Sequence, residues 1–263
     1  MKVLVVFAHP EPKSLNGSLF KVTVEELKKL GHEVKTSDLY AMKWKSNIDA
    51  HDFPGFNQDE NRLIIADESV KCYKKYSLTK DVMEEQEKIE WADLLIFQFP
   101  FWWYSMPAIL KGWFDRVLAN GFAYGIGFSK EKPRGECYGE GYLKGKRAML
   151  SITFGDPETS YSERGIEGDI FDLLFPIQHG LLFYPGMDVL EPFLIYECNT
   201  FPKENYEKAA DLLRERLKNI EKDAPIAFRS QNGGDYDKYT LELKPEKFNP
   251  KIRGLKIHLK DSE

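Results

Sequence analysis

The chain alternates between short apolar runs and stretches with the length and pattern of a helix, and this alternation constrains its fold more than any other feature. The run "MKVLVVFAH" stops at His9 and Pro10, and "NGSLFKVTVEELKKLG" then places Phe20, Val24 and Leu27 on one helical face. A continuous apolar run is typical of a strand buried on both faces of a sheet. Strands that alternate with helices specify a parallel sheet covered by helices on both faces.

The same alternation continues to about residue 222 and predicts five strands and five helices. The expected strands are 1–9, 32–40, 93–100, 147–154 and 187–196, and the expected helices are 16–31, 81–92, 107–118, 165–182 and 203–222. We expect the fourth helix to break or kink before Pro176 and residues 41–80 to be irregular. Five such strands predict an α/β fold of the flavodoxin-like, doubly wound type, with helices on both faces and a C-terminal extension. This fold binds its ligand at the carboxyl ends of the strands.

Composition excludes several classes of function. The formal net charge is -5 and no basic stripe occurs, which argues against a nucleic-acid partner. The apolar runs are too short to span a bilayer and no signal peptide precedes the first strand, so we expect a cytoplasmic protein. The three cysteines (Cys72, Cys137 and Cys198) are widely spaced without metal-binding histidines nearby, and we expect free thiols.

Three loops follow expected strands and should meet at one edge of the sheet. In the first, Ser14 and Asn16 precede a helix and could bind an anion or only cap that helix. His9 could contact a ligand or be a hydrogen-bonded structural residue. This loop has neither the G-x-G-x-x-G nor the G-x-x-x-x-G-K pattern, which disfavours a Rossmann dehydrogenase and a P-loop nucleotide triphosphatase.

The second loop follows "FQFP" and concentrates aromatic rings. Rings of this kind could be ordinary core or could flank a flat ligand such as an isoalloxazine. Phe97 and Phe99 belong to the strand and are expected in the core, whereas Trp103 and Tyr104 are our candidates for ligand contact. Farther along, Trp113 and Phe114 are expected to be buried against the helix or at a subunit contact.

The third loop contains Thr153, Gly155 and Tyr161. Its backbone N–H groups could meet the polar edge of a flavin, with Gly155 allowing a close approach, or the segment could be an ordinary turn. The Tyr161 hydroxyl could stabilise charge that develops during flavin reduction. No single loop is specific, and their common position is what favours a flavin site.

Taken in order, "FQFP", "PAILKGWFDRV", "FAY", "SIT", "YSERGIEGD", "PIQHG" and "VLEP" resemble the NAD(P)H:quinone oxidoreductase (DT-diaphorase) family of flavodoxin-like flavoproteins. The resemblance covers roughly residues 1–225. It implies a homodimer with one FAD per subunit, in which NAD(P)H gives a hydride to flavin N5 and leaves before a quinone enters the same pocket. It also implies an FAD-binding catalytic domain at 1–225. From about residue 223 the chain turns polar and rich in Lys, Asp and Pro, so we expect 226–263 to be a C-terminal extension that covers a surface or the partner subunit.

The resemblance assigns residues by position. The cofactor-binding residues would be His9, Ser14, Leu15, Asn16, Pro100, Phe101, Trp103, Tyr104, Thr153, Phe154, Gly155 and Tyr161. The substrate pocket would include Trp103, Tyr104 and Phe154, together with Tyr124 and Tyr184 contributed by a partner subunit. Tyr161 would be catalytic.

Several positions depart from the family pattern. Glu167 replaces the histidine that follows the catalytic tyrosine, so Glu167 is a second catalytic candidate that must be protonated, turned away or paired near a reduced flavin. Where the family has a Gly-Gly pair this chain has Gly155 and Asp156, and Ile126 replaces the family's second tyrosine after "FAY". The glycine-rich insertion at 126–145 favours a mobile lid. A metal site known in one branch would need ligands beside His179, and Phe183 and Phe228 occupy those positions, so we predict no metal.

Other functions fit the same fold. An FMN-dependent azoreductase or nitroreductase is the nearest alternative. A flavodoxin-like electron carrier would need an exposed flavin edge, which the crowded aromatic loop disfavours. A regulatory flavoprotein with little turnover is compatible with the missing histidine. No motif in the chain selects NADH over NADPH or names a physiological quinone.

Overall fold

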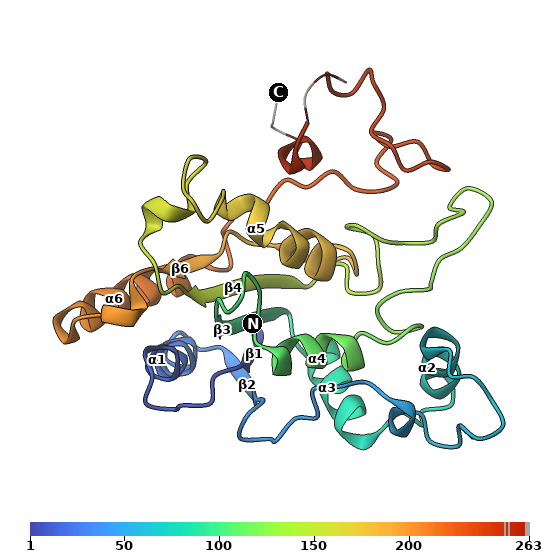
Figure 1. Ribbon diagram of the computed structural model, residues 1–263, viewed down its shortest axis with the longest axis horizontal. Coiled ribbons are helices and arrows are strands. Elements are labelled where there is room, and N and C mark those ends of the chain that lie inside the picture. The colour runs from blue at the N-terminus through green and yellow to red at the C-terminus, as the bar shows by residue number, and fades with distance from the viewer. Residues whose placement is uncertain (250, 252, 261–263) are drawn as a thin grey trace.

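The computed structural model describes residues 1–249, 251 and 253–260, and its centre is one parallel sheet (Figure 1). The strands β1 (Lys2–Phe7), β2 (Glu33–Asp38), β3 (Leu94–Pro100), β4 (Arg147–Thr153) and β5 (Asp188–Val189) lie in the order β2-β1-β3-β4-β5. This is the order expected for a flavodoxin-like sheet, so the predicted fold class is confirmed.

The fifth expected strand, 187–196, is wrong in its extent because it is divided in two. β5 pairs with the start of β4, and β6 (Phe193–Ile195) pairs with its end, so that Ser151 lies opposite Phe193. Pro192 lies between the two pieces and has no N–H to donate to a ladder. The division still brings the carboxyl end of β6 to the same sheet edge as the end of β4.

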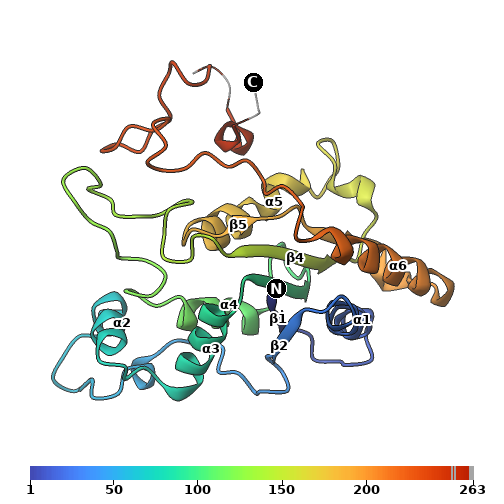
Figure 2. The ribbon, with the colours of Figure 1, turned by 180° about the vertical axis from the view of Figure 1, so that it is seen from behind.

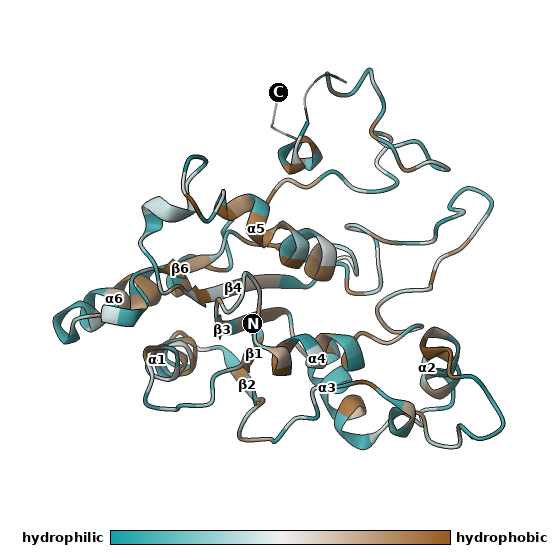
Figure 3. Cartoon of the chain, viewed as in Figure 1, coloured by the Kyte–Doolittle hydropathy of each residue, from teal (hydrophilic) through white to brown (hydrophobic). Residues whose placement is uncertain are grey.

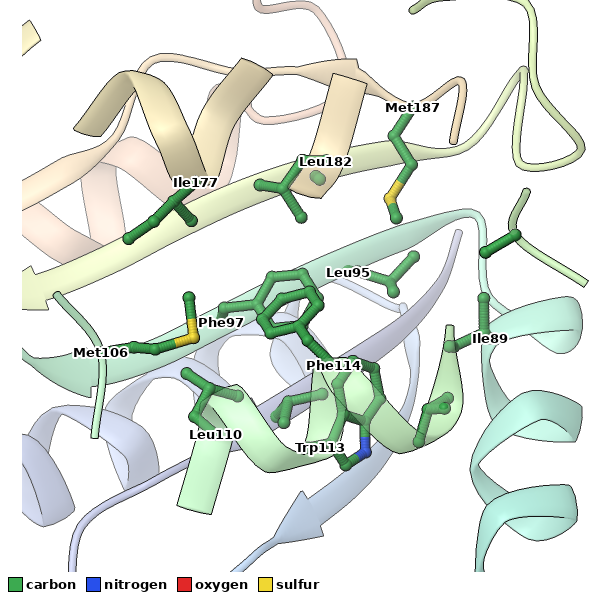
Figure 4. Close-up of a cluster of buried hydrophobic side chains, with 14 of the residues drawn as sticks. Ile89, Leu95, Phe97, Met106, Leu110, Trp113, Phe114, Ile177, Leu182 and Met187 are labelled. Atoms are coloured by element: carbon green, nitrogen blue, oxygen red, sulfur yellow. The ribbon is translucent and has the colours of Figure 1, made fainter. Parts of the chain in front are cut away.

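Alternate residues of the central strands supply two separate cores, one on each face of the sheet. Val3, Val5 and Ile96 pack with the buried residues of α1 (Leu15–Lys29) and α6 (Lys203–Asn219). Phe97 and Phe99, both fully buried as expected, belong to the opposite core with α3 (Lys80–Trp91), α4 (Ala108–Val117) and α5 (Ile170–Ile177). Figure 4 shows Phe97 beside Phe114 of α4, in one cluster with Ile177 of α5.

Trp113 and Phe114 are buried within this second core, in agreement with one of the two expectations for them. Their rings meet edge to face, with centroids 5.2 Å apart, and Phe97 contacts both. Such contacts add about 0.5–1.5 kcal/mol each beyond the area they bury. The tight packing fixes α4, and with it the aromatic loop that joins β3 to α4.

Residues 41–80 are more ordered than expected. They contain a 3₁₀ turn (Ala50–Asp52) and the helix α2 (Ile65–Lys74), which the analysis of the sequence missed. The segment is tied to the body through Arg116, whose buried Nε lies 2.7 Å from Asp52. Trp44, Phe53 and Cys72 are also buried in the main core, and Asn120 N donates to Ser69 Oγ of α2 at 2.9 Å. Contacts with distant residues therefore order this segment, and hydrophobic periodicity does not reveal them.

Of the break or kink expected before Pro176, the break does not occur. α5 runs through Pro176 and continues directly as a π-helix, Gln178–Phe183. The wider turn of a π-helix accommodates irregular backbone bonding, and such turns occur often at functional sites. Leu182 is fully buried and Phe183 nearly so. Because these side chains pack in the core, the helical segment continues past Pro176 instead of ending there.

The insertion at 126–145 and the C-terminal segment both lack long helices or strands among the described residues (Figures 1 and 2). Backbone bonds join the insertion to the end of the π-helix, from Tyr138 N to Tyr184 O at 2.8 Å and from Gly139 N to Phe183 O at 2.9 Å. The C-terminal segment is mostly hydrophilic in Figure 3, yet Phe228 enters the core of the main body. One short 3₁₀ turn, Leu255–His258, lies near its end. Among the described residues, no helix is long and apolar enough to cross a membrane.

Candidate active site

The three loops that the sequence placed at one edge do surround a common cavity of about 360 Å³. It lies at the carboxyl ends of β1, β3, β4 and β6. Ten of the expected cofactor-binding residues line it, namely His9, Ser14, Leu15, Asn16, Pro100, Phe101, Thr153, Phe154, Gly155 and Tyr161. The topology of a parallel sheet accounts for this convergence, because all the strands end at the same edge.

Ser14 caps α1, which was one of its two expected roles. Its Oγ accepts a hydrogen bond from Gly17 N at 3.0 Å, and it also lies 3.0 Å from Nδ1 of His9. Partial burial lowers the pKa of His9, so the imidazole is neutral at pH 7. The cap and the histidine fix the loop that forms one wall of the cavity.

Asn16 presents an unused acceptor in the cavity wall. The residue is 3% exposed, its Nδ2 donates to Thr153 Oγ1, and its backbone oxygen accepts from Gln98 Nε2 at 3.0 Å. Its Oδ1 is buried and has no partner within the described part of the chain. A buried acceptor without a partner costs about 1–3 kcal/mol, so the site fits a ligand that donates hydrogen bonds, as the ribityl hydroxyls of a flavin do.

Trp103 and Tyr104 do not line this inner cavity, and their contact with a cofactor ring remains a prediction. They line a second, more open pocket of about 260 Å³, together with Phe101, Asp156, Tyr161 and Glu167. Trp103 is 95% exposed, and both residues have left-handed φ angles of 50° and 58°. Two successive strained residues are uncommon outside functional sites. Phe101 and Tyr161 line both spaces, so the pocket continues the cavity outward.

Glu167 is paired, which is one of the three arrangements expected for it, and its partner is Tyr104. The Tyr104 hydroxyl donates a hydrogen bond to Glu167 Oε2, and this bond raises the pKa of Tyr104. Burial, with the nearby charges of Asp156 and Glu167, raises the pKa of Tyr161 to about 12. The Tyr161 hydroxyl therefore keeps its proton through the physiological range and can act as a hydrogen-bond donor.

Tyr124 and Tyr184 lie together in another pocket, of about 300 Å³, that shares no residue with the first cavity. Burial raises the pKa of both hydroxyls. Within one chain they therefore do not contact the space where a flavin would bind. This separation is compatible with the expected contribution of these tyrosines to a partner's pocket.

The surroundings of His179 are aromatic. Its ring stacks on Tyr138 and on Phe175, with centroids 4.7 and 4.5 Å away, and Phe228 contacts its edge. The described residues contain no group of three or more His, Cys, Asp or Glu side chains that could hold a metal ion. The absence of a metal remains a prediction.

Four residues of the cavity were not among the expected site residues, namely Trp102, Asp156, Cys198 and Asn199. Trp102 was passed over within the aromatic run, yet its ring lies 5.8 Å from that of His9. Cys198 and Asn199 follow β6, so the carboxyl-end rule applied to the fifth strand would have found them. A Cβ at Gly155 would come within 2.5 Å of Asn199 Nδ2, which shows how closely this loop approaches.

Comparison with known proteins agrees with this geometry. Residues 1–219 match the model of a protein family whose description is "flavodoxin-like fold". The ribosyldihydronicotinamide dehydrogenase-like protein traD of Penicillium crustosum is 51% identical over 98% of this chain and 95% of its own length. Ribosyldihydronicotinamide dehydrogenase (quinone) of Mus musculus is 45% identical over 86% of this chain and 94% of its length.

Two further comparisons extend the likeness. NAD(P)H dehydrogenase (quinone) 1 of Cavia porcellus is 41% identical over 86% of this chain and 80% of its own length. The solved structure of a protein from Klebsiella pneumoniae, provisionally named a quinone reductase, superposes with a TM-score of 0.95 at 48% identity, covering 98% of this chain and 99% of that one. The chain therefore belongs to the NAD(P)H:quinone oxidoreductase family of flavodoxin-like proteins.

Proposed function

We propose that this protein is a flavin-dependent quinone reductase that moves two electrons, as a hydride, from a reduced nicotinamide to a quinone. The observation that supports it most is the pairing of two adjoining spaces. An inner cavity contains the unpartnered Asn16 Oδ1, and an outer aromatic pocket opens beside it through Phe101 and Tyr161. The names of the related quinone dehydrogenases support the same reaction.

The residues of the inner cavity would hold the cofactor, which we propose to be FAD. Asn16 and Thr153 would bind the ribityl chain, the Ser14 loop with its helix N-terminus would bind phosphate, and Gly155 would approach the polar edge of the ring. When bound, the flavin supplies a ring that accepts and returns a hydride. The protein's task is then to hold the ring, exclude water and orient each substrate in turn, in a ping-pong sequence.

The residues of the outer pocket would bind the substrates. Trp103 and Tyr104 would flank a flat ring by stacking. Tyr161, which keeps its proton, would donate a hydrogen bond to a quinone oxygen and stabilise the charge that grows there. Glu167, paired with Tyr104, would fix that ring and is the candidate for returning a proton.

We further propose that the working unit is a homodimer with the active site at the subunit interface. Trp103 is almost completely exposed in one chain, which is unfavourable for a large aromatic ring unless something covers it. Tyr124 and Tyr184 form an aromatic surface elsewhere on the same chain. In a two-fold dimer each chain would offer its tyrosines to the partner's outer pocket, so that one chain alone would be inactive.

The first test is the visible spectrum of the purified protein, recorded without oxygen before and after addition of a donor. NADH, NADPH and N-ribosyldihydronicotinamide are compared, and the released cofactor is identified by chromatography. A yellow protein that bleaches promptly and is re-oxidised by a quinone supports the proposal. Yellow protein that does not bleach indicates a carrier or regulator, released FMN favours the azoreductase alternative, and failure to bind either flavin refutes the function.

The dimer is tested by complementation. Subunits carrying Trp103→Ala are mixed with subunits carrying Tyr184→Ala after each has been shown to be weakly active and folded. Random pairing makes half of the dimers mixed, and each mixed dimer has one intact site, so about a quarter of the normal activity should return. If the mixture is no more active than its components, the two residues do not form a shared site.

A further inference from the structure

A cavity of about 290 Å³ lies apart from the flavin site, between the C-terminal segment, the insertion and α5 with its π-helical continuation. It shares no residue with the inner cavity or the outer pocket. Both ribbon views show the C-terminal segment lying above α5 (Figures 1 and 2). Phe175 of α5 lines the cavity. The residues that matter most are Tyr138, Phe175, His179, Arg229, Tyr236 and His258.

The walls of this cavity are mostly flat rings. His179 stacks between Tyr138 and Phe175, with interplanar angles of 27° and 15°. Tyr236 stacks on His258 at 23°, and its hydroxyl lies 2.8 Å from Nδ1 of that histidine. Planar walls of this kind favour a planar ligand, because offset stacking is the preferred contact between rings.

Arg229 is the charged group of the cavity, and it is incompletely paired. The residue is 5% exposed, Nε donates to the carbonyl of Ile257 at 3.1 Å, and Nη1 donates to Asp235 Oδ2 at 3.1 Å. Nη2 is buried without a partner in the described residues, as is Nε2 of His179. Buried polar atoms are almost always satisfied, so two orphans beside one cavity indicate that a ligand binds there, and the Arg229 guanidinium requires that this ligand carry an acceptor atom.

The charges around the cavity favour an acceptor that is anionic. Its lining holds one guanidinium, two imidazoles and two phenols, and no carboxylate. Burial lowers the pKa of both imidazoles, to about 4 for His179, so they are neutral donors or acceptors at pH 7. Asp235 approaches Arg229 through Nη1 and is itself 3.9 Å from Lys247, which leaves Nη2 free for a second carboxylate.

We propose that this cavity is a second binding site and that it takes a small aromatic carboxylate, with the ring among the aromatic side chains of the walls and the carboxylate on Arg229. Such a ligand would join three parts of the chain and hold the C-terminal segment on the body. The outer pocket at the flavin site would not compete for it, because Asp156 and Glu167 place two carboxylates there.

Benzoate is the probe, titrated into the full-length protein as purified and followed by calorimetry and by thermal unfolding. Benzamide and benzylammonium have the same ring without the negative charge and serve as matched ligands. For so small a molecule we expect a dissociation constant of about 1 mM or tighter. Benzoate should bind about tenfold more tightly than benzamide, and benzylammonium should bind more weakly than either.

Arg229→Gln should abolish the preference for benzoate over benzamide. If that variant loosens the C-terminal segment, Leu241→Trp answers the question independently, because Leu241 lines the cavity and a larger side chain reduces the space in it while Arg229 is unchanged. Loss of benzoate binding in Leu241→Trp supports the site. Equal binding of the three ligands, or benzoate binding that both variants retain, overturns it. The readouts are binding and melting temperature, so the result does not depend on flavin or on turnover.

Discussion

Thr153→Val tests whether the hydrogen bond from Asn16 organises the cavity. Thr153 is the last residue of β4, and its Oγ1 is the acceptor for the buried Asn16 Nδ2. Valine has nearly the same shape and suits a strand, so the change removes the acceptor with little alteration of packing. The substitution therefore isolates one polar contact that joins the first and third loops.

The expected cost follows from the burial of Asn16. Its side chain is 3% exposed, so Nδ2 cannot recover a water when Thr153 Oγ1 is lost. An unsatisfied buried donor costs about 1–3 kcal/mol. Valine also removes a hydroxyl that is itself buried, which offsets part of this cost. We expect the free energy of unfolding to fall by about 1–2 kcal/mol, or the melting temperature by about 2–8 °C for a chain of this size.

The assay is urea unfolding followed by circular dichroism, on protein freed of flavin, for the wild type, Thr153→Val, Asn16→Ala and the double variant. If the two side chains act through their mutual bond, the double variant costs less than the sum of the single ones, with a coupling of about 1 kcal/mol. Flavin affinity should fall about tenfold in Asn16→Ala, which also loses the free Oδ1. Strict additivity, or a loss below about 0.5 kcal/mol in Thr153→Val, would refute the reasoning.

Three further predictions concern other parts of the chain. Trp103→Ala should weaken flavin binding or quinone turnover while changing the free energy of unfolding by less than about 0.5 kcal/mol. Tyr76→Ala is the control, because Tyr76 is a similarly exposed residue with a left-handed φ angle. Unchanged kinetics in Trp103→Ala would contradict the assignment of Trp103 to the substrate and flavin site. Burial and His258 lower the pKa of His179 to about 4, below its unfolded value, so folding stability should fall as pH drops from 7 to 4, and His179→Phe should lessen that loss in urea titrations. The difference from 6.5 corresponds to at most about 3 kcal/mol, and solvent near the partly exposed ring reduces the expected effect to about 1–2 kcal/mol; identical pH profiles would exclude it. Gly112→Ala should destabilise the protein by about 1–3 kcal/mol in the same assay, because a Cβ would lie 1.8 Å from Ser46 O, whereas an unobstructed helix would be stabilised.

Much of the fold could be predicted because it depends on short-range periodicity. The apolar runs before His9 and Pro100 identify buried strands, and the strand–helix alternation leaves few topologies. The errors arise where distant contacts override local preference. Pro176 continues its helix because the next turns are packed against the core, and α2 forms in a polar segment that the Arg116 ion pair anchors. Neither cause is visible within a window of neighbouring residues.

The candidate site shows the same division. Its inner cavity could be predicted, because the carboxyl-end rule places whole loops and does not depend on side-chain detail. The outer pocket could not be predicted in the same way. Whether Trp102 or Trp103 faces the cavity depends on a tight turn, closed by backbone bonds between Trp102 and Ser105, that reverses the direction of successive side chains. Sequence patterns do not predict which of two neighbouring residues in such a turn lines the cavity.

The partner of Glu167 is the clearest example of what sequence position alone cannot supply. From sequence position, this carboxylate is expected only to be protonated, turned away or paired, because a charge beside a reduced flavin is unfavourable. In the folded chain it accepts a hydrogen bond from Tyr104, which lies 63 residues earlier. The tyrosine hydroxyl satisfies the carboxylate and also fixes the orientation of an otherwise half-exposed ring. One departure from the family pattern is thus balanced by an aromatic residue in another loop, and only the topology of the sheet brings the two together.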